Sequence, residues 1–272
     1  MLEIHKGEAD LSRRAVTYHL HGLSFREFLQ FEYGYKMEAL PLSDILTKHI
    51  ELAMNVSKQL KPLVAFNEYL TYGYFPLYKE DKILYHERLL ATLNTILDVD
   101  LPSTEKIDYY SIGKIKKLFS ILAGLVPYIP NISMLSKEIE VSRISLLNYL
   151  SYLQKAQALL LLDKEASGIK QLAKPEKIYL GNTNYAYALG GEKTDIGNVR
   201  ETFFFNQTAV KHKVTYSSQI DFTLNETYNF EIGGKNKTQK QLAGVENGYL
   251  ALDNIEIGFN NEIPLWLFGL MY

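Results

Sequence analysis

Hydrophobic residues recur at helical spacing from the first aromatic run of the chain onward. Phe25, Phe28 and Leu29 lie at i, i+3 and i+4, which is the spacing of one face of an α-helix. Ser24 with Glu27 three residues later has the form of a capping box, in which each residue satisfies a free backbone N–H at a helix start. The pattern therefore predicts a helix that begins directly after Ser24.

The middle of the chain continues with helical patterns. An amphipathic helix is predicted from Ile83 to Leu97, and residues 99–111, which contain proline and small polar residues, are predicted to be a loop. Helices are then predicted at Leu118–Val126, Ser133–Ile139 and Arg143–Leu162. The tight connection between the last two is typical of a helix-turn-helix.

The last of these helices carries a polar stripe opposite a leucine-rich side. Residues at i, i+3, i+7 and i+10 share one helix face. The stripe consists of Ser145, Asn148, Tyr152 and Lys155, and Arg143 adds a charge at the helix start. With Lys177–Leu180 as a wing strand, the stripe is a candidate DNA-binding surface. Residues 131–180 hold seven basic and five acidic side chains, so few phosphate contacts are on offer, and protein packing is the alternative.

After Gly181 the hydrophobic period changes to strict alternation, which indicates strands. Alternating runs cover residues 210–216, 220–224 and 228–232, and Tyr249–Leu252 is predicted to be another strand. A helix is expected at Arg200–Ala209, and Pro264 suits the first turn of a short apolar C-terminal helix. The last hundred residues are therefore predicted to be an α+β unit.

Two acidic residues are predicted to face each other in this unit. Leu224 and Tyr228 flank a three-residue turn, so the runs on either side should form a hairpin, and the same register places Asp221 opposite Glu231. Like charges across a ladder are destabilising unless a cation or a proton lies between them. The pair would suit Mg²⁺, which is commonly held by one or two carboxylates. The alternative is a solvated pair neutralised by a nearby lysine: Lys235, Lys237 or Lys240.

Composition limits the chemistry further. The 272 residues contain no cysteine and have a net charge of -2, which excludes disulfides and thiolate metal sites and gives no bulk attraction to nucleic acid. No P-loop pattern and no G-x-S-x-G motif occur. Without a signal peptide or an apolar run of about 20 residues, the chain is expected to be soluble and cytoplasmic, without membrane contact.

Six segments spread over nearly the whole chain resemble one family, the prokaryotic AAA-type ATPases that carry a C-terminal domain of unknown function. These segments are LSRRA at 11–15, GLSFREF at 22–28, YLTYGYFP at 69–76, KPEKIYL at 174–180, FEIGGK at 230–235 and IPLWLFG at 263–269. The resemblance implies four consecutive parts along the chain. They are the end of an ATPase core (1–23), a helical lid or linker domain (24–112), a winged helix-turn-helix (113–180) and a restriction-endonuclease-like α/β domain (181–272).

The resemblance also implies roles for particular residues. Arg13 and Arg14 would be sensor or finger arginines, which act on ATP only within a complete ATPase core, so the chain itself is not expected to hydrolyse ATP. In the nuclease pattern, Glu201 would be the helix acid, and Asp221 and Glu231 would be the metal ligands. Gly233 takes the place of the pattern's lysine, which Lys235 could replace only across a bulge.

These observations lead to one expectation and two alternatives. The chain is expected to be a DNA- or protein-binding module of an AAA-type ATPase, with no cofactor of its own. The first alternative is a Mg²⁺-dependent nuclease that uses Glu201, Asp221, Glu231 and Lys235. The second is a regulatory scaffold, which no feature of the sequence separates from the binding module.

Overall fold

The first described helix begins where the capping box predicts. The computed structural model describes residues 19–105, 107–164 and 174–272. Ser24 Oγ accepts a hydrogen bond from the Glu27 backbone N (3.1 Å), and the Glu27 carboxylate accepts one from the Ser24 backbone N (2.9 Å). Helix α2 (Phe25–Tyr33) buries its predicted apolar face and ends at Gly34, whose φ of 68° places it in the left-handed region.

Further helices follow up to residue 155. They are α3 (Leu42–Ser57), α4 (Pro62–Glu68), α5 (Tyr85–Thr95), α6 (Leu101–Glu105), α7 (Tyr109–Ala123), α8 (Ile132–Glu138) and α9 (Arg143–Lys155). The loop prediction for 99–111 is wrong at both ends, because the π-helix η3 (Ile96–Asp100) runs directly into α6 and α7 begins at Tyr109. Pro102 is the second residue of α6, and proline is tolerated in a first helical turn, where its missing N–H costs little.

The predicted helix Arg143–Leu162 is too long, because α9 ends at Lys155. Gln157 has a φ of 55°, and Leu159–Leu162 forms strand β1, which pairs antiparallel with β2 (Lys177–Leu180). Four consecutive leucines fit a buried strand as well as a buried helix, so periodicity could not decide between them. The strand predicted at 177–180 is confirmed.

The C-terminal part contains a five-stranded sheet with the order β3-β4-β5-β6-β7. Its strands are β3 (Val214–Thr215), β4 (Phe222–Leu224), β5 (Tyr228–Gly234), β6 (Gly248–Asp253) and β7 (Glu262–Pro264). Pairing is antiparallel from β3 to β5 and parallel from β5 to β7. Helix α11 (Ile196–Thr208) covers one face, where Phe204 packs against Phe222 and Phe230 with ring centroids 5.3 and 5.0 Å apart.

Two sequence predictions for this part hold only in outline. The run 210–216 forms the two-residue strand β3, and the predicted C-terminal helix is the 3₁₀ helix η6 (Leu265–Leu270), whose residues are all buried. The strand predicted at 249–252 is confirmed as part of β6. The described chain is thus a mixed α+β structure with a helical N-terminal region and a C-terminal sheet.

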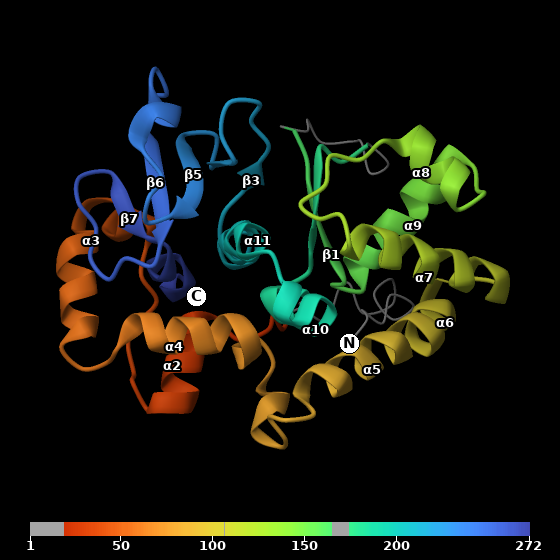
Figure 1. Ribbon diagram of the computed structural model, residues 1–272, viewed down its shortest axis with the longest axis horizontal. Coiled ribbons are helices and arrows are strands. Elements are labelled where there is room, and N and C mark those ends of the chain that lie inside the picture. The colour runs from red at the N-terminus through yellow and green to blue at the C-terminus, as the bar shows by residue number, and fades with distance from the viewer. Residues whose placement is uncertain (1–18, 106, 165–173) are drawn as a thin grey trace, which may run out of the picture.

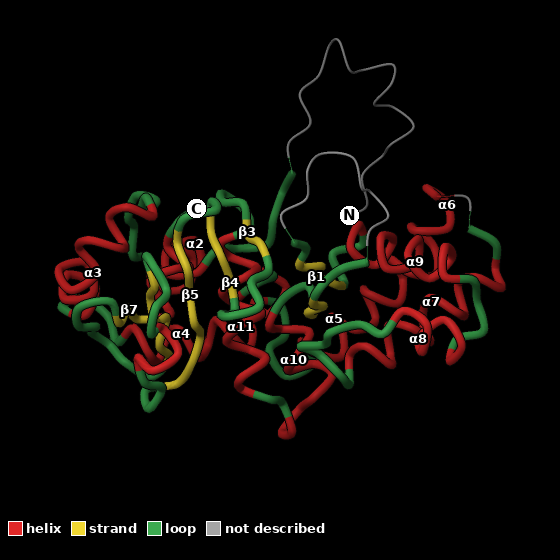
Figure 2. Tube along the Cα trace, turned by 90° about the horizontal axis from the view of Figure 1, so that it is seen from above, coloured by secondary structure: helices red, strands yellow, loops and turns green. Residues whose placement is uncertain are grey.

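The two ends of the described chain pack together. In Figure 1, α2, α3 and α4 lie beside the C-terminal sheet, and α3 packs against both β7 and η6. Helices α5 to α9 lie at the other end of the molecule, as Figure 2 also shows. Helix α10 (Thr183–Gly190) lies between the two ends and packs on α5. Packing therefore crosses the predicted boundaries at 112/113 and 180/181.

A buried asparagine fixes this contact between the two ends. Asn184 on α10 accepts hydrogen bonds from the Tyr74 backbone N (3.0 Å) and the Tyr85 hydroxyl (2.6 Å), and it donates to the Leu70 carbonyl (2.9 Å). Buried polar groups need such partners, because an unpaired one loses its hydrogen bonds to water without replacement. The network ties α10 to α5 and to the π-helix η1 (Tyr69–Gly73).

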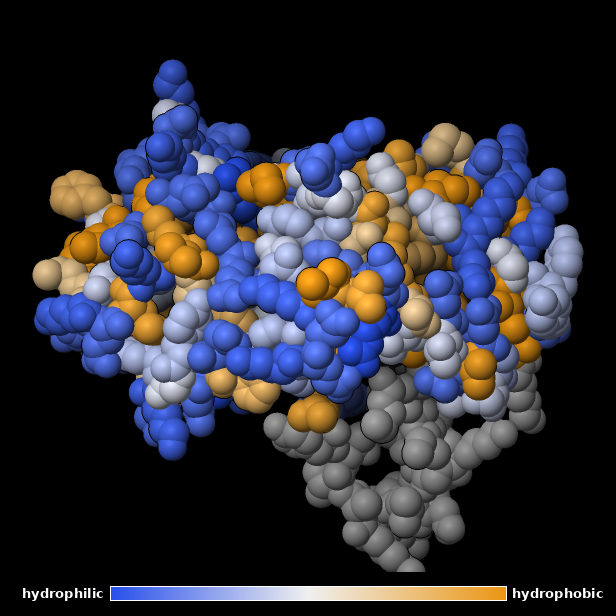
Figure 3. Space-filling model, turned by 60° about the horizontal axis from the view of Figure 1, so that its bottom comes forward, coloured by the Kyte–Doolittle hydropathy of each residue, from blue (hydrophilic) through white to orange (hydrophobic). Residues whose placement is uncertain are grey.

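Within the described residues, no helix combines the length and hydrophobicity needed to cross a membrane. On the face shown in Figure 3, hydrophobic side chains form several small groups separated by hydrophilic ones. Small groups of this kind are ordinary on protein surfaces. The described side chains visible in this view therefore form no large apolar area.

Candidate functional site

Asp221 and Glu231 lie side by side at the end of the β4–β5 ladder, as the hairpin register predicts. Leu224 pairs with Tyr228, and the ladder continues to Phe222 opposite Phe230. The Asp221 backbone N donates to Glu231 Oε2 (3.3 Å), and the Ile232 backbone N donates to Asp221 Oδ2 (2.8 Å). Each carboxylate is therefore held by the backbone of the opposite segment.

A lysine supplies the cation that this acidic pair requires. Lys237 Nζ lies 2.6 Å from Glu231 Oε1 and 3.8 Å from Asp221 Oδ2, and it also donates to the Ile232 carbonyl (2.6 Å). The Glu231 side chain is only 7% exposed, so its charge has little access to water. An ammonium group is thus built into the site, and we refer to Asp221, Glu231 and Lys237 as the acid–lysine cluster.

Lys237 reaches the pair through space that Gly233 leaves open. A Cβ atom at position 233 would lie 2.1 Å from Lys237 Cδ. The turn that follows β5 is closed by a hydrogen bond from the Lys237 backbone N to the Gly234 carbonyl (2.9 Å). The lysine stem therefore occupies the place of a side chain at 233, the position that the nuclease pattern assigns to its lysine.

Lys235, the lysine proposed from the sequence for this role, lies elsewhere. It lines a pocket with Arg200 and Asn254, and no ion pair joins it to Asp221 or Glu231 among the described residues. The turn after Gly234 brings Lys237 back over β5 to the two acids, and Lys235 is not the lysine that pairs with them. The sequence signal was present, since a glycine at the expected position was followed by a lysine within one turn.

Glu201 lies near the same region, where residues of β2 already bind its carboxylate. Its Oε2 accepts hydrogen bonds from Lys177 Nζ (2.6 Å) and the Tyr179 hydroxyl (2.8 Å). Burial raises the pKa of Tyr179, and the charges of Glu201 and Asp221 raise it further. The Tyr179 ring also packs against Phe222, the residue next to Asp221, with centroids 5.7 Å apart, so the structure brings the predicted helix acid close to the acid–lysine cluster.

Burial and neighbouring charges both act on the Asp221 carboxyl. Burial raises its pKa, the Ile232 N–H opposes this, and the charge of Glu231 raises the pKa again. Its Oδ1 atom has no hydrogen bond to the described residues. One carboxylate oxygen is therefore available to a cation or a substrate proton. No group of three or more His, Cys, Asp or Glu with metal-site geometry occurs in the described ranges.

The predicted stripe on α9 is only partly available. Arg143 is exposed at the start of the helix, whereas the Ser145 hydroxyl pairs with Ser142 Oγ (2.9 Å) within the helix cap. Lys155 Nζ donates to Glu105 Oε1 (2.8 Å). Asn148 and Tyr152 are half-buried. Arg13 and Arg14, the predicted ATP-site arginines, lie outside the described residues.

Comparisons with known proteins found one family model and one distant relative. A family model described as a domain of unknown function (DUF8612) matches residues 63–195, which end just before α11. The uncharacterized protein MJ1637 of Methanocaldococcus jannaschii is 24% identical over 173 residues, which cover 62% of this chain and 37% of that relative. The match thus spans little more than a third of the relative's length. No solved structure matches the chain.

Proposed function

We propose that the chain is the C-terminal part of an AAA-type ATPase and serves as its nucleic-acid-binding module. The observation that carries this proposal is the order of elements from α7 to β2. Three helices followed by a two-stranded antiparallel sheet have the order of a winged helix, with α9 as the recognition helix. The ATPase assignment rests on the sequence resemblance.

Contacts within the molecule limit which residues of α9 could meet DNA. Recognition helices contact base edges mainly through their N-terminal residues. Arg143 lies there and is exposed, while Lys155 at the other end shares its charge with Glu105. Arg143 is therefore the main contact in this proposal, and Asn148, half-buried further along α9, is a secondary one. A protein partner is the alternative occupant of the same surface.

A binding titration of the full chain with a labelled DNA duplex at low salt tests this proposal. We expect Arg143→Ala to weaken binding about tenfold and to reduce the salt slope by about 1. Lys155→Ala is the matched control and should change affinity less, because Glu105 already neutralises that charge. Absence of any salt-sensitive binding would contradict the proposal and would point to a protein partner.

Mg²⁺-dependent cleavage of nucleic acid is a second candidate function, favoured by the position of Lys237. In a restriction-endonuclease-like module, Asp221 and Glu231 would hold the metal, with Glu201 nearby and Lys237 as the lysine. The residues fit Mg²⁺, which commonly binds one or two carboxylates and retains several waters. When bound, the metal would supply an activated water and neutralise charge on phosphate. Lys237 would compete with it for Glu231, so weak metal binding is expected.

Plasmid cleavage in the presence of Mg²⁺ or Mn²⁺ tests the second candidate. We expect the unmodified chain to nick the plasmid and Asp221→Ala to be inactive. Lys237→Met should also be inactive, whereas Lys193→Met, at an exposed lysine of the 3₁₀ helix Gly191–Lys193, should retain activity. Circular dichroism of each variant separates lost chemistry from lost folding. Plasmid that stays intact with both metals would rule out cleavage and leave the binding proposal unaffected.

A further inference from the structure

A separate polar pocket lies at the carboxyl ends of two parallel strands. It has a volume of about 320 Å³ and is lined by Arg200, Gly234, Lys235, Asn236, Lys237 and Asn254. Strand β5 ends at Gly234 and its parallel neighbour β6 ends at Asp253. In open α/β sheets, ligands bind outside the carboxyl ends of the parallel strands. The pocket is therefore in a favourable place for a ligand.

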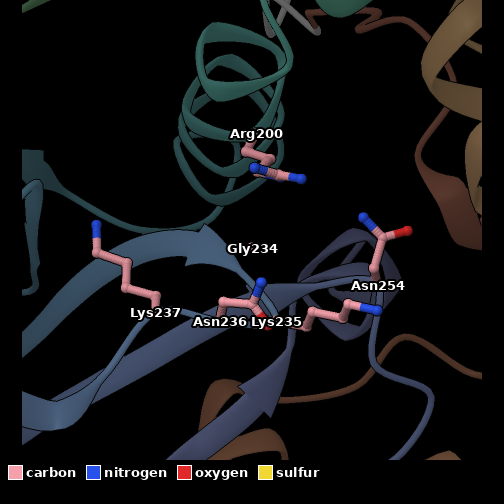
Figure 4. A pocket seen from close by; sticks show the side chains of 6 residues that line it. All are labelled: Arg200, Gly234, Lys235, Asn236, Lys237 and Asn254. Carbon is pink, nitrogen blue, oxygen red and sulfur yellow. The ribbon is translucent and has the colours of Figure 1, made fainter.

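The pocket borders the acid–lysine cluster, and Lys237 belongs to both, since it lines the pocket and pairs with Glu231. Figure 4 shows the Lys237 and Lys235 side chains on opposite sides of Asn236, with Lys235 extending toward Asn254. The ammonium of Lys237 is engaged by Glu231, as described above. The charge inside the pocket consequently comes from Arg200 and Lys235.

Arg200 is held in a fixed position with part of its guanidinium free. Its Nε donates to Asp253 Oδ2 (2.8 Å), and the Asp253 side chain is only 5% exposed. A Cβ atom at Gly234 would lie 3.2 Å from Nη1 and 3.3 Å from Nη2, so the guanidinium lies directly against the end of β5. Neither Nη group has a hydrogen-bond partner among the described residues. Arginine has five donors, so several remain for a ligand.

Asp253 also positions the opposite wall of the pocket. Its Oδ1 accepts from the Asn254 backbone N (2.7 Å), and its Oδ2 accepts from Asn254 Nδ2 (3.1 Å). Lys235 is exposed and makes no ion pair with the described residues. Arg200 pairs with the buried Asp253 carboxylate and Lys235 adds a charge that is unpaired among the described residues, so the pocket carries a net positive charge. Because Asp253 holds both Arg200 and Asn254 in place, the hydrogen-bond donors of the pocket are preorganised.

We propose that this pocket binds a phosphate group. The free Nη groups of Arg200 form the planar fork that matches phosphate oxygens, and Lys235 adds a second positive charge. Gly234 has no side chain to block the approach to the strand end. The phosphate belongs either to a free phosphate ester or to a nucleic-acid backbone. Binding requires neither a divalent metal nor α9, so the inference is independent of both proposed functions.

Calorimetric titration of the full chain at low salt tests this inference with two probes. The probes are inorganic phosphate and a single-stranded oligonucleotide without a terminal phosphate. If inorganic phosphate binds and the oligonucleotide does not, the natural ligand is a free phosphate ester. Oligonucleotide binding that inorganic phosphate displaces would identify the backbone. Either result supports a phosphate site, provided that it depends on the pocket residues.

Three variants establish that dependence. Lys235→Gln and Arg200→Lys should each weaken binding about tenfold, because each loses a charge-assisted contact. Arg200→Lys keeps a cation beside Asp253, and Lys235 is exposed, so both variants should fold. Lys193→Gln, an exposed lysine of the 3₁₀ helix Gly191–Lys193, should have no effect. No binding of either probe, or equal binding by all variants, would overturn the inference. Arg143→Ala should leave phosphate binding unchanged, which separates this test from that of DNA binding.

Discussion

Lysines form ion pairs both in the acid–lysine cluster and at the end of α9, but their surroundings differ. Lys237 is 22% exposed and its partner Glu231 is 7% exposed, whereas Lys155 is 41% exposed and Glu105 is 18% exposed. A buried carboxylate that loses its partner keeps its desolvation cost, while a surface pair is solvated when it separates. Geometrically similar ion pairs should therefore differ in what their removal costs.

This difference also bears on function. The cluster keeps two carboxylates together at a cost in stability, with one lysine to offset it, and such an arrangement is common at functional sites. On α9, the ion pair with Glu105 reduces the charge available to a partner and leaves Arg143 as the exposed cation. The cluster thus concentrates buried charges in one place, whereas α9 presents one exposed cation.

The largest expected effect comes from removing Lys237. Lys237→Ala should lower the free energy of unfolding by about 3 kcal/mol, because it leaves Glu231 buried beside Asp221 without a cation. Lys155→Ala should cost less than about 1 kcal/mol. Urea unfolding followed by the fluorescence of Trp266, the single tryptophan, measures both, since this residue is buried in the C-terminal core.

Lys235→Ala is the matched control for that measurement, because Lys235 lies on the same turn but is exposed. Its effect should stay within about 0.5 kcal/mol. If Lys237→Ala were no more destabilising than Lys235→Ala, Glu231 would not depend on its lysine. The contrast between the cluster and α9 would then be wrong.

Local patterns predicted much of the fold. The capping box at Ser24 and the three-residue turn after Leu224 both lie within a few residues of the structure that they specify. The turn fixed the register, and the register placed Asp221 beside Glu231. In each case the residues that determine the local structure lie close together in the sequence, so the sequence pattern is sufficient to predict it.

Predictions failed where distant segments decide the outcome. Leu159–Leu162 became a strand because β2 pairs with it, and its composition alone suits a helix equally well. Lys155 meets Glu105, fifty residues away in sequence. The packing of α3 against β7 joins the two ends of the described chain. Lys237 lies within one turn of β5, but its selection over Lys235 depends on how that turn folds back.

A smaller effect, of opposite sign, is expected from removing the charge of Asp221. Burial raises the pKa of this carboxyl, so the folded state binds its proton more tightly than the unfolded state does. The protonated Asp221 carboxyl therefore stabilises the fold fully below the unfolded-state pKa of about 3.9. This stabilisation is lost as the pH rises through the folded-state pKa. Ionised Asp221 therefore costs stability at neutral pH. Asp221→Asn removes that charge and keeps an oxygen for the Ile232 N–H.

Thermal unfolding across the acidic to neutral range checks this expectation against the unmodified chain. Asp221→Asn should raise the melting temperature at neutral pH, by less than Lys237→Ala lowers it, and the gain should disappear below about pH 4. In the Asp221→Asn variant, Lys237 should form an ion pair with Glu231 alone, whose Oε1 lies 2.6 Å from its Nζ. A lower melting temperature at neutral pH would mean that Lys237, 3.8 Å from Asp221, compensates for burial at both carboxylates. In that case Asp221 would be a structural ion-pair partner, and the cluster would differ from the α9 pair only in degree.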